Sequence, residues 1–338
     1  MRILIVTPAP ANSRYGNRVT ALRWFRILKE AGHRVAIKQS YSNEQIDLLV
    51  ALHAHRSFDS ISRAHRIHPE TPVIVTLTGT DVYGDLNPGT RAFKSLEIAT
   101  RIVALQPKAL DELPPRLKKK TRVIYQSVRK PGKVARQRAS ASEDKKTSSY
   151  GNSSKSLHEG ARAFDVCVVG HLRPVKDPFR AAMASRKLPG SSRIRVVQVG
   201  GAMSDEAASW AEAEMKANPR YRWLGEQPGW RVRQILERSR LFVLSSKSEG
   251  GANALGEAIV AGLPVLASRI PGSTGILGER YPGYFDVGDT KELALLMSRA
   301  ETDSKFLARL ELHCHRLAPL FDPARERVAW AKLLKEIR

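Results

Sequence analysis

Short apolar runs alternate with amphipathic segments along most of the chain, and this alternation predicts its secondary structure. An apolar run at residues 2–7 is followed by a polar loop and by an amphipathic segment, residues 19–31, that ends at Gly32. Further apolar runs lie at residues 35–37, 46–53, 72–77, 101–105 and 122–125, with a helical segment at 58–67. Strands that alternate with helices in this way predict a parallel, doubly wound sheet.

A second series of the same kind begins at residue 165. Its predicted strands are residues 165–169, 195–199, 223–224, 241–245 and 265–268, and its predicted helices are 179–187, 205–217, 231–238, 291–300, 305–317 and 323–337. The fold class is therefore α/β, with two Rossmann-like, doubly wound domains that face a central cleft. The predicted boundaries are 1–128 for the first domain, 129–163 for a linker, 164–317 for the second domain and 318–338 for a C-terminal helix that packs back towards the first.

The segment between the two halves has a different composition. From residue 129 to residue 162 the apolar periodicity disappears and Lys, Arg and Ser dominate, which predicts a flexible basic linker or inserted loop. This segment holds a good share of the net charge of +23. Such a charge suits nucleic acid, a membrane surface or small anionic substrates. The segment could make weak phosphate or nucleic-acid contacts or could simply be a solvated loop. Aromatic side chains are not interleaved with the basic ones as single-strand binding requires, so a solvated loop is favoured and no nucleic-acid partner is expected.

Cysteine content and hydropathy indicate the compartment. The two cysteines argue against a disulfide framework, and Cys167 lies in an apolar run, where a buried small hydrophobe is expected. No apolar run approaches the length of a membrane span, and residues 1–6 enter a strand directly rather than forming a signal peptide. We therefore expect a cytoplasmic protein without a membrane span.

Polar and basic residues follow the strands of the first half, where ligands of doubly wound sheets bind. No G-x-G-x-x-G follows the first strand, which argues against a dinucleotide, and no cofactor is predicted. Arg14 and Arg18 could grip a small anion or simply cap or solvate the next helix. Asp81 could orient an acceptor, act as a base or cap a helix. By loop position, the predicted acceptor-binding residues are Arg14, Gly16, Asn17, Arg18, Thr78, Thr80 and Asp81.

A glycine-rich loop after the strand at 241–245 carries the most specific chemistry. Gly250 and Gly251 let backbone amides approach a ligand closely, and the helix that follows offers its positive end to an anion. Glu249 and Glu257 frame this anion site, and ionised carboxylates accept hydrogen bonds from sugar hydroxyls. The pattern suits a nucleotide-sugar, although a glycine-rich turn with solvated acids would look the same.

A basic loop, residues 170–178, follows the first strand of the second half and opens on the same edge of the sheet. It carries Arg173 and Lys176. A lysine at this edge can neutralise a diphosphate leaving group without a metal ion. The chain has no Asp-x-Asp motif, the usual carboxylate clamp for a nucleotide-bound divalent ion, so metal-independent chemistry and no metal site are predicted.

The second half resembles the nucleotide-sugar domain of the family 4 glycosyltransferases, which have the GT-B fold. The match rests on Gly225-Glu226, on Gly170-His171-Leu172-Arg173-Pro174-Val175-Lys176, and on the stretch from Glu249 to Glu257 with the trailing Ala261-Gly262-Leu263-Pro264-Val265. The resemblance implies that Glu257 holds the ribose hydroxyls of a nucleotide-sugar and that Glu249 holds hydroxyls of the transferred sugar. It implies that the diphosphate is held by Lys176 and by the backbone amides of Gly250, Gly251, Ala252 and Asn253.

The same resemblance extends the predicted donor site to Gly170 and His171. The family usually has an arginine at the position of His171, and Arg173 is a candidate to replace it. The residues predicted to take part in catalysis are Lys176, Arg173 and Glu249.

A narrower resemblance covers nearly the whole chain except the linker. The runs that are similar to the selenosugar synthases of selenoneine biosynthesis include Gly16-Asn17-Arg18-Val19-Thr20-Ala21-Leu22-Arg23-Trp24, Leu77-Thr78-Gly79-Thr80-Asp81 and Phe321-Asp322-Pro323-Ala324-Arg325-Glu326. This family also has the His171-Leu172-Arg173 version of the basic loop. The resemblance implies a UDP-sugar donor (UDP-N-acetylglucosamine or UDP-glucose), selenophosphate as the acceptor, a carbon–selenium bond in the product and an acceptor site in the first domain.

Two alternatives stay open at the level of sequence. One is an ordinary family 4 glycosyltransferase that transfers a sugar to a hydroxyl acceptor. The other is a polyanion-binding protein with a degenerate transferase fold, which would bind RNA in a salt-sensitive way and would have no affinity for a UDP-sugar. The sequence also leaves open which UDP-sugar is preferred, whether the anomeric centre is inverted, and the oligomeric state.

Overall fold

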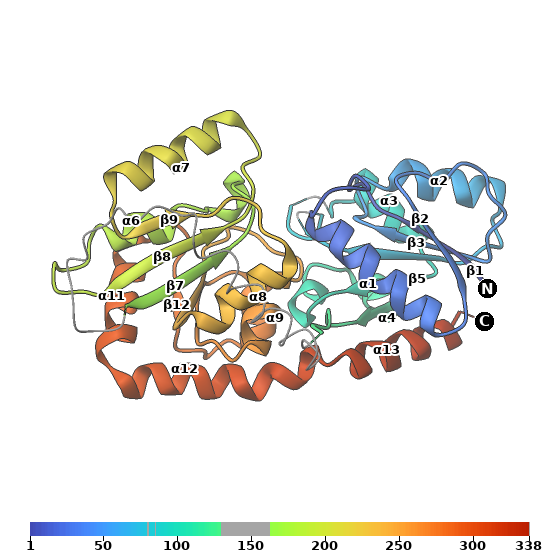
Figure 1. Cartoon of the computed structure of the whole chain (residues 1–338). Helices are drawn as coiled ribbons and strands as arrows, with labels where there is room; N and C mark the ends of the chain where they lie inside the picture. The colour runs from blue at the N-terminus through green and yellow to red at the C-terminus, as the bar shows by residue number, and fades with distance from the viewer. Residues whose placement is uncertain (80, 85, 130–162, 338) are drawn as a thin grey trace.

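The computed structural model describes residues 1–79, 81–84, 86–129 and 163–337. The chain forms two α/β domains that lie side by side (Figure 1). Residues 130–162, which make up almost all of the predicted linker, lie outside the described part of the chain. The predicted site residue Thr80 also lies outside it.

The first domain is built, within the described residues, on a six-stranded parallel sheet in the order β2-β1-β3-β4-β5-β6. The strands are β1 (Arg2–Val6), β2 (Arg34–Lys38), β3 (Leu48–Leu52), β4 (Val73–Leu77), β5 (Arg101–Ala104) and β6 (Thr121–Val123). The helical elements are α1 (Gly16–Glu30), α2 (Phe58–Ile67), α3 (Arg91–Ile98), the 3-10 turn η1 (Pro107–Leu110) and α4 (Pro115–Lys119).

Each face of this sheet is buried in its own core. Successive side chains of a strand point to opposite faces, so Leu4 and Val6 of β1 pack in one apolar cluster while Ile3 and Ile5 pack in the other. A strand that is buried on both faces reads as a continuous apolar run rather than an alternating one. The parallel order and the two cores confirm the predicted α/β, doubly wound class.

The second domain has the same plan, with its described strands in the parallel order β12-β11-β10-β7-β8-β9. The strands are β7 (Phe164–Val169), β8 (Ile194–Val199), β9 (Tyr221–Trp223), β10 (Leu241–Leu244), β11 (Val265–Ser268) and β12 (Tyr284–Phe285). The helical elements are the 3-10 turn η2 (Pro174–Lys176), α6 (Arg180–Ser185), α7 (Asp205–Ala217), α8 (Gly229–Arg238), α9 (Asn253–Val260), α10 (Pro271–Leu277), α11 (Thr290–Thr302) and α12 (Ser304–Leu317).

Two helices differ from the prediction in ways that affect the site. Helix α1 begins at Gly16, three residues before the predicted start, because its first turn is polar and lies outside the apolar periodicity. Helix α10 was not predicted. It has seven residues that begin with Pro271, and most of them are small or polar, a composition without a helical pattern; the helix is stabilised by burial of most of its residues.

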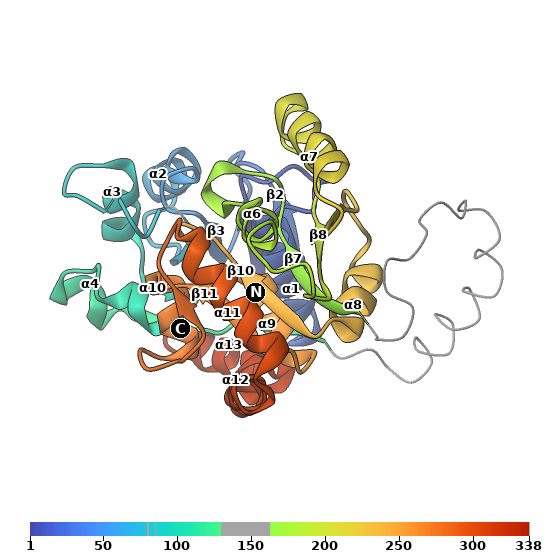
Figure 2. The same ribbon diagram turned by 90° about the vertical axis from the view of Figure 1, so that its left-hand side faces the viewer.

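The chain crosses back to the first domain at its end. After α12, the short turn η3 (Ala318–Phe321) leads into α13 (Pro323–Lys335), whose first residue follows the capping side chain of Asp322. The ring of Trp330 on α13 packs at 4.8 Å from that of Trp24 on α1. Both views show α12 and α13 along the same side of the molecule, opposite α7 (Figures 1 and 2).

Candidate functional site

A cleft of about 650 Å³ opens between the two domains. Its walls come from the loops that follow the carboxyl ends of the strands in both sheets and from one face of α1. Among the described residues that line it, nine are Lys or Arg and three are Glu. Basic side chains therefore outnumber acidic ones at the cleft, and the resulting positive potential attracts anionic ligands.

The two walls touch each other at the base of the cleft. A methyl group placed on Gly250 would lie 2.5 Å from the backbone carbonyl carbon of Thr78, so only a glycine permits this approach. Gly251 meets the side chain of Leu105 in the same way, at 2.3 Å. Gly250 itself does not line the cleft. The missing side chain of Gly250 thus permits the contact between domains, and its predicted place in the donor site stays a prediction.

Charged contacts also join the two domains, at the cleft and beside it. Arg14 forms an ion pair with Glu226 at 3.3 Å, and Lys108 forms one with Glu279 at 2.7 Å. The Nδ1 atom of His171 accepts from the backbone N–H of Gly201 at 3.2 Å, which leaves its Nε2 atom to face the carbonyl oxygen of Arg14 at 3.4 Å. His171 is thus fixed to its own domain at one nitrogen and contacts the opposite wall with the other.

Lys176 and Glu249 meet on the wall of the second domain. The Nζ atom of Lys176 lies 2.5 Å from Oε1 of Glu249, and that oxygen also accepts from the hydroxyl of Ser246 at 2.6 Å. Both side chains line the cleft. The pair places a cation and a hydrogen-bond acceptor side by side, an arrangement that suits a ligand with both a phosphate and sugar hydroxyls.

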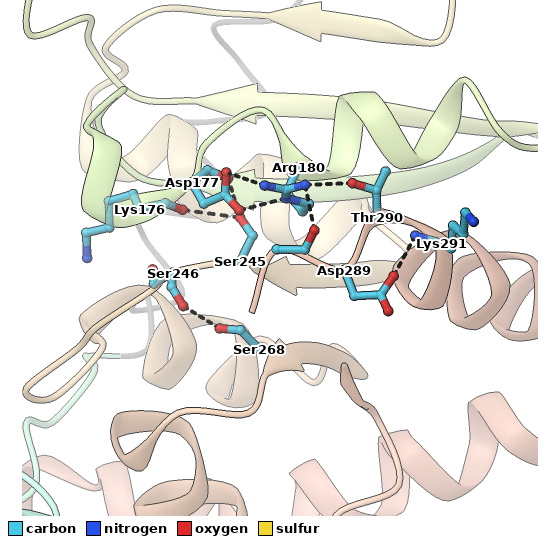
Figure 3. A network of polar contacts seen from close by, with 10 residues as sticks. Lys176, Asp177, Arg180, Ser245, Ser246, Ser268, Asp289, Thr290 and Lys291 are labelled. Carbon is cyan, nitrogen blue, oxygen red and sulfur yellow. Dashed lines mark hydrogen bonds and ion pairs between the residues drawn. The ribbon is translucent and has the colours of Figure 1, made fainter. Parts of the chain in front are cut away.

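A partly buried polar network holds the loop that carries Lys176 (Figure 3). Arg180 donates to the carboxylate of Asp177 at 2.7 Å and to the hydroxyl of Thr290 at 2.6 Å. Asp177 has a φ of +43°, a left-handed conformation that side chains other than glycine rarely adopt, and the ion pair stabilises it. Ser245, at the end of β10, donates to the carbonyl of Asp177 at 2.8 Å. The backbone around Lys176 is therefore fixed to the neighbouring strand.

Glu257 lies one turn into α9, whose N-terminus faces the cleft with Ala252 and Asn253 on its wall. Burial raises the pKa of the Glu257 carboxyl, and the guanidinium groups of Arg23 and Arg233 partly offset this effect. Gly170, His171 and Arg173 also line the cleft. Apart from Gly250, all the predicted donor-site and catalytic residues therefore lie around one cavity.

The predicted acceptor residues separate into two groups. Arg14, Gly16, Asn17 and Thr78 line the cleft, whereas Arg18 and Asp81 do not. The residues of α1 that line the cleft lie on one face of the helix and are Gly16, Asn17, Val19, Thr20, Arg23, Arg26 and Ile27. Arg18 lies outside this face, and its predicted acceptor role stays a prediction.

Asp81 braces a loop of the first domain. Its carboxylate is fully buried and accepts from the backbone N–H groups of Ala54 (2.8 Å), Thr78 (3.2 Å) and Gly79 (2.8 Å). These three hydrogen bonds hold the loop that carries Thr78. The predicted role of Asp81 in orienting an acceptor or acting as a base stays a prediction.

Several basic residues that line the cleft were not predicted, most of them because they lie on helices rather than in the loops after strands. They are Arg23 and Arg26 on α1, Arg56 after β3, Arg129 after β6, Arg233 on α8 and Arg327 on α13. The helical spacing from Gly16 would have found Arg23, because residues 16, 19, 20 and 23 share one face of a helix that begins there.

Comparison with known proteins gives a family match for the second half. Residues 152–312 match the family described as Glycosyl transferases group 1. The UDP-Gal:alpha-D-GlcNAc-diphosphoundecaprenol alpha-1,3-galactosyltransferase of Escherichia coli is 29% identical over 160 residues, which are 45% of this chain and 40% of that protein. The chain thus spans less than half the length of this curated relative.

Solved structures match over the whole chain. Anabaena HepE in complex with UDP and glucose has a TM-score of 0.71 at 16% identity, with 99% of each chain covered. The sucrose-phosphate synthase of Thermosynechococcus elongatus has a TM-score of 0.73 at 15% identity, with 99% of this chain and 98% of that chain covered. The chain therefore has the GT-B fold of these structures, and residues 152–312 are similar to the Glycosyl transferases group 1 family.

In the described part of the chain, no helix is long and apolar enough to cross a membrane. The described residues also contain no group of three or more His, Cys, Asp or Glu side chains placed to hold a metal ion.

Proposed function

We propose that this protein is a glycosyltransferase that takes its sugar from a UDP-sugar. The observation that carries the proposal is the second wall of the cleft, where Lys176, the N-terminus of α9 and two glutamates surround one cavity. A helix N-terminus and a lysine suit a diphosphate, and carboxylates suit the hydroxyls at its two ends. The family match of this domain and the fold shared with Anabaena HepE, solved with UDP and glucose, support the same ligand.

In this proposal each end of the donor has its own residues. Glu257 accepts from the ribose hydroxyls, and the backbone amides from Gly251 to Asn253 donate to the diphosphate. Lys176 turns from Glu249 towards the diphosphate as negative charge develops there, and Glu249 accepts from hydroxyls of the sugar. Charge stabilisation of the departing UDP is then the main catalytic effect of this wall.

We further propose selenophosphate as the acceptor. The resemblance to selenosugar synthases supports it, and so does the excess of basic side chains over acidic ones in the cleft. Arg14, Asn17 and Thr78 of the first domain are the acceptor-side residues that line the cavity. Selenium attacks the anomeric carbon and forms the carbon–selenium bond, while the bond from that carbon to the diphosphate oxygen breaks and its electron pair leaves with UDP. A strong nucleophile needs positioning more than a general base.

The test is a product assay with the purified protein, selenophosphate and either UDP-N-acetylglucosamine or UDP-glucose. The expected result is release of UDP together with a selenosugar that mass spectrometry identifies by the selenium isotope pattern. Release of UDP only with lipid or glycan hydroxyl acceptors would overturn the selenium step and leave a sugar transferase. No affinity for UDP and no UDP release with any acceptor would overturn the whole proposal.

Uridine affinity is expected to fall on acidification at a higher pH than an ordinary glutamate would impose. Only the ionised carboxylate of Glu257 accepts from both ribose hydroxyls, and its raised pKa means that protonation begins earlier as the pH falls. Loss of a hydrogen bond to a charged group corresponds to roughly a tenfold or larger change in affinity. Calorimetric titration from neutral to mildly acidic pH measures it, and uridine is used because it has no titrating phosphate.

Glu257→Gln is the control for this titration. The glutamine amide keeps the shape of the side chain but cannot gain a proton in this pH range. The variant should therefore bind uridine more weakly than the wild type, with an affinity that does not change with pH. Identical pH profiles for the wild type and Glu257→Gln would contradict the role given to Glu257.

A further inference from the structure

Arg23 connects the first domain to the donor wall of the second. It lies on the face of α1 that lines the cleft. Its Nη2 atom donates to the side-chain oxygen of Asn253 at 3.1 Å, across 230 positions of sequence. Asn253 is the first residue of α9. An arginine of the acceptor-side domain therefore reaches the helix N-terminus where the diphosphate is proposed to bind.

The surroundings of Arg23 leave part of the guanidinium group unused. Among the described residues, its Nη1 atom is buried and has no hydrogen-bond partner. Burial lowers the pKa of Arg23. The carboxylates of Glu326 and Glu257 interact electrostatically with its guanidinium group and partly offset this effect. Glu326 is already engaged, because its two oxygens accept from Nε1 of Trp24 at 2.7 Å and from the backbone N–H of Ser127 at 2.9 Å.

A buried donor without an acceptor is costly, and a ligand that supplies the acceptor removes the cost. A guanidinium only donates hydrogen bonds and matches phosphate geometry, whereas the carboxylate of Glu257 only accepts and matches hydroxyls. Arg23 contacts Asn253, at the proposed diphosphate end of the site, and interacts electrostatically with Glu257, at the proposed ribose end. The ligand atoms expected between those two ends are the oxygens of the phosphate attached to the ribose.

We infer that Arg23 binds the nucleoside-proximal phosphate of the donor, so that the first domain contributes directly to donor affinity. The inference rests on the proposed function, because it takes the ligand of this wall to be a nucleoside diphosphate sugar. It adds a residue from the opposite domain to the donor site. Domain contact and phosphate binding are then coupled through one side chain.

The experiment compares uridine, UMP and UDP as probes of the wild type and of Arg23→Gln by calorimetric titration. Arg23→Gln should lower the affinity for UMP and for UDP by roughly tenfold or more, the effect expected for the loss of a hydrogen bond to a charged group. Its affinity for uridine should equal that of the wild type. Lys29→Gln removes the same charge from an exposed position of the same helix. It should bind all three probes like the wild type.

Each other outcome has a definite meaning. Equal weakening of uridine, UMP and UDP, or no change in any of them, would overturn the inference while the UDP affinity of the wild type upholds the proposed function. A wild type that binds no UDP would overturn both. If Arg23→Gln does not fold by circular dichroism, Arg23→Lys is used. Lysine keeps the positive charge but lacks the planar set of guanidinium donors. This variant should still lower the affinity for UMP more than the affinity for uridine.

Discussion

Lys176→Met is expected to lower kcat for sugar transfer by roughly 10²- to 10³-fold, the effect of removing one preorganised charge-stabilising group. Methionine keeps the length and apolar stem of the side chain but removes the cation beside Glu249. Glu249 keeps its hydrogen bond from Ser246, so the loop should stay folded. The measurement is steady-state UDP release, with UDP affinity determined separately by calorimetry so that chemistry and binding are distinguished.

Lys247→Met is the matched control for this variant. Lys247 is exposed, belongs to the neighbouring loop that carries Glu249 and lies outside the cleft. Its kcat should equal that of the wild type. A kcat of Lys176→Met within a factor of three of the wild type, with both variants folded, would show that the lysine does not stabilise the leaving group.

Gly250→Ala is expected to lower kcat by roughly 10²-fold, because a displacement of about 1 Å between reacting groups has an effect of this size. The added methyl group would lie 2.5 Å from the carbonyl carbon and 2.7 Å from the carbonyl oxygen of Thr78. These are backbone atoms of the other domain and cannot move aside as a flexible side chain would. The two walls of the cleft must therefore separate, while the fold of each domain stays intact.

Three measurements test the Gly250→Ala variant. Steady-state kinetics gives kcat, calorimetry gives the affinity for uridine, and small-angle X-ray scattering reports the separation of the domains. Uridine affinity should not change, because Glu257 lies in the second domain. Gly190→Ala is the control, since a methyl group there meets nothing within 4 Å. Full activity of Gly250→Ala with an unchanged scattering profile would contradict the closed arrangement of the domains.

Much of the fold was accessible from local patterns. Strands β1, β4 and β7 are buried on both faces, and each coincides with an apolar run to within a residue at either end. The predicted helices at 58–67 and 205–217 have the bounds observed for α2 and α7. The exception was α10, whose small and polar residues have no periodicity and whose helix depends on burial against its neighbours.

The donor wall was also predictable in outline, because its parts are local motifs. Lys176 and Glu249 each follow a strand of the same parallel sheet, and the carboxyl ends of parallel strands share one edge. Their meeting at the cleft follows from that topology. The network of Arg180, Asp177 and Thr290 was not predicted, since it joins two segments that are 110 positions apart in the sequence.

The apolar alternation of the sequence by itself determined the two parallel sheets and which loops open at their carboxyl edges, because burial on both faces leaves a continuous apolar run. Only the tertiary structure decided which side chains the cleft exposes. In the structure Arg18 lies outside the cleft lining, Asp81 is buried and accepts hydrogen bonds from three backbone amides, and Gly250 contacts Thr78. The side chain of Arg23 also reaches Asn253. These contacts join distant segments of the chain and depend on how the two domains dock, which no local pattern of residues encodes.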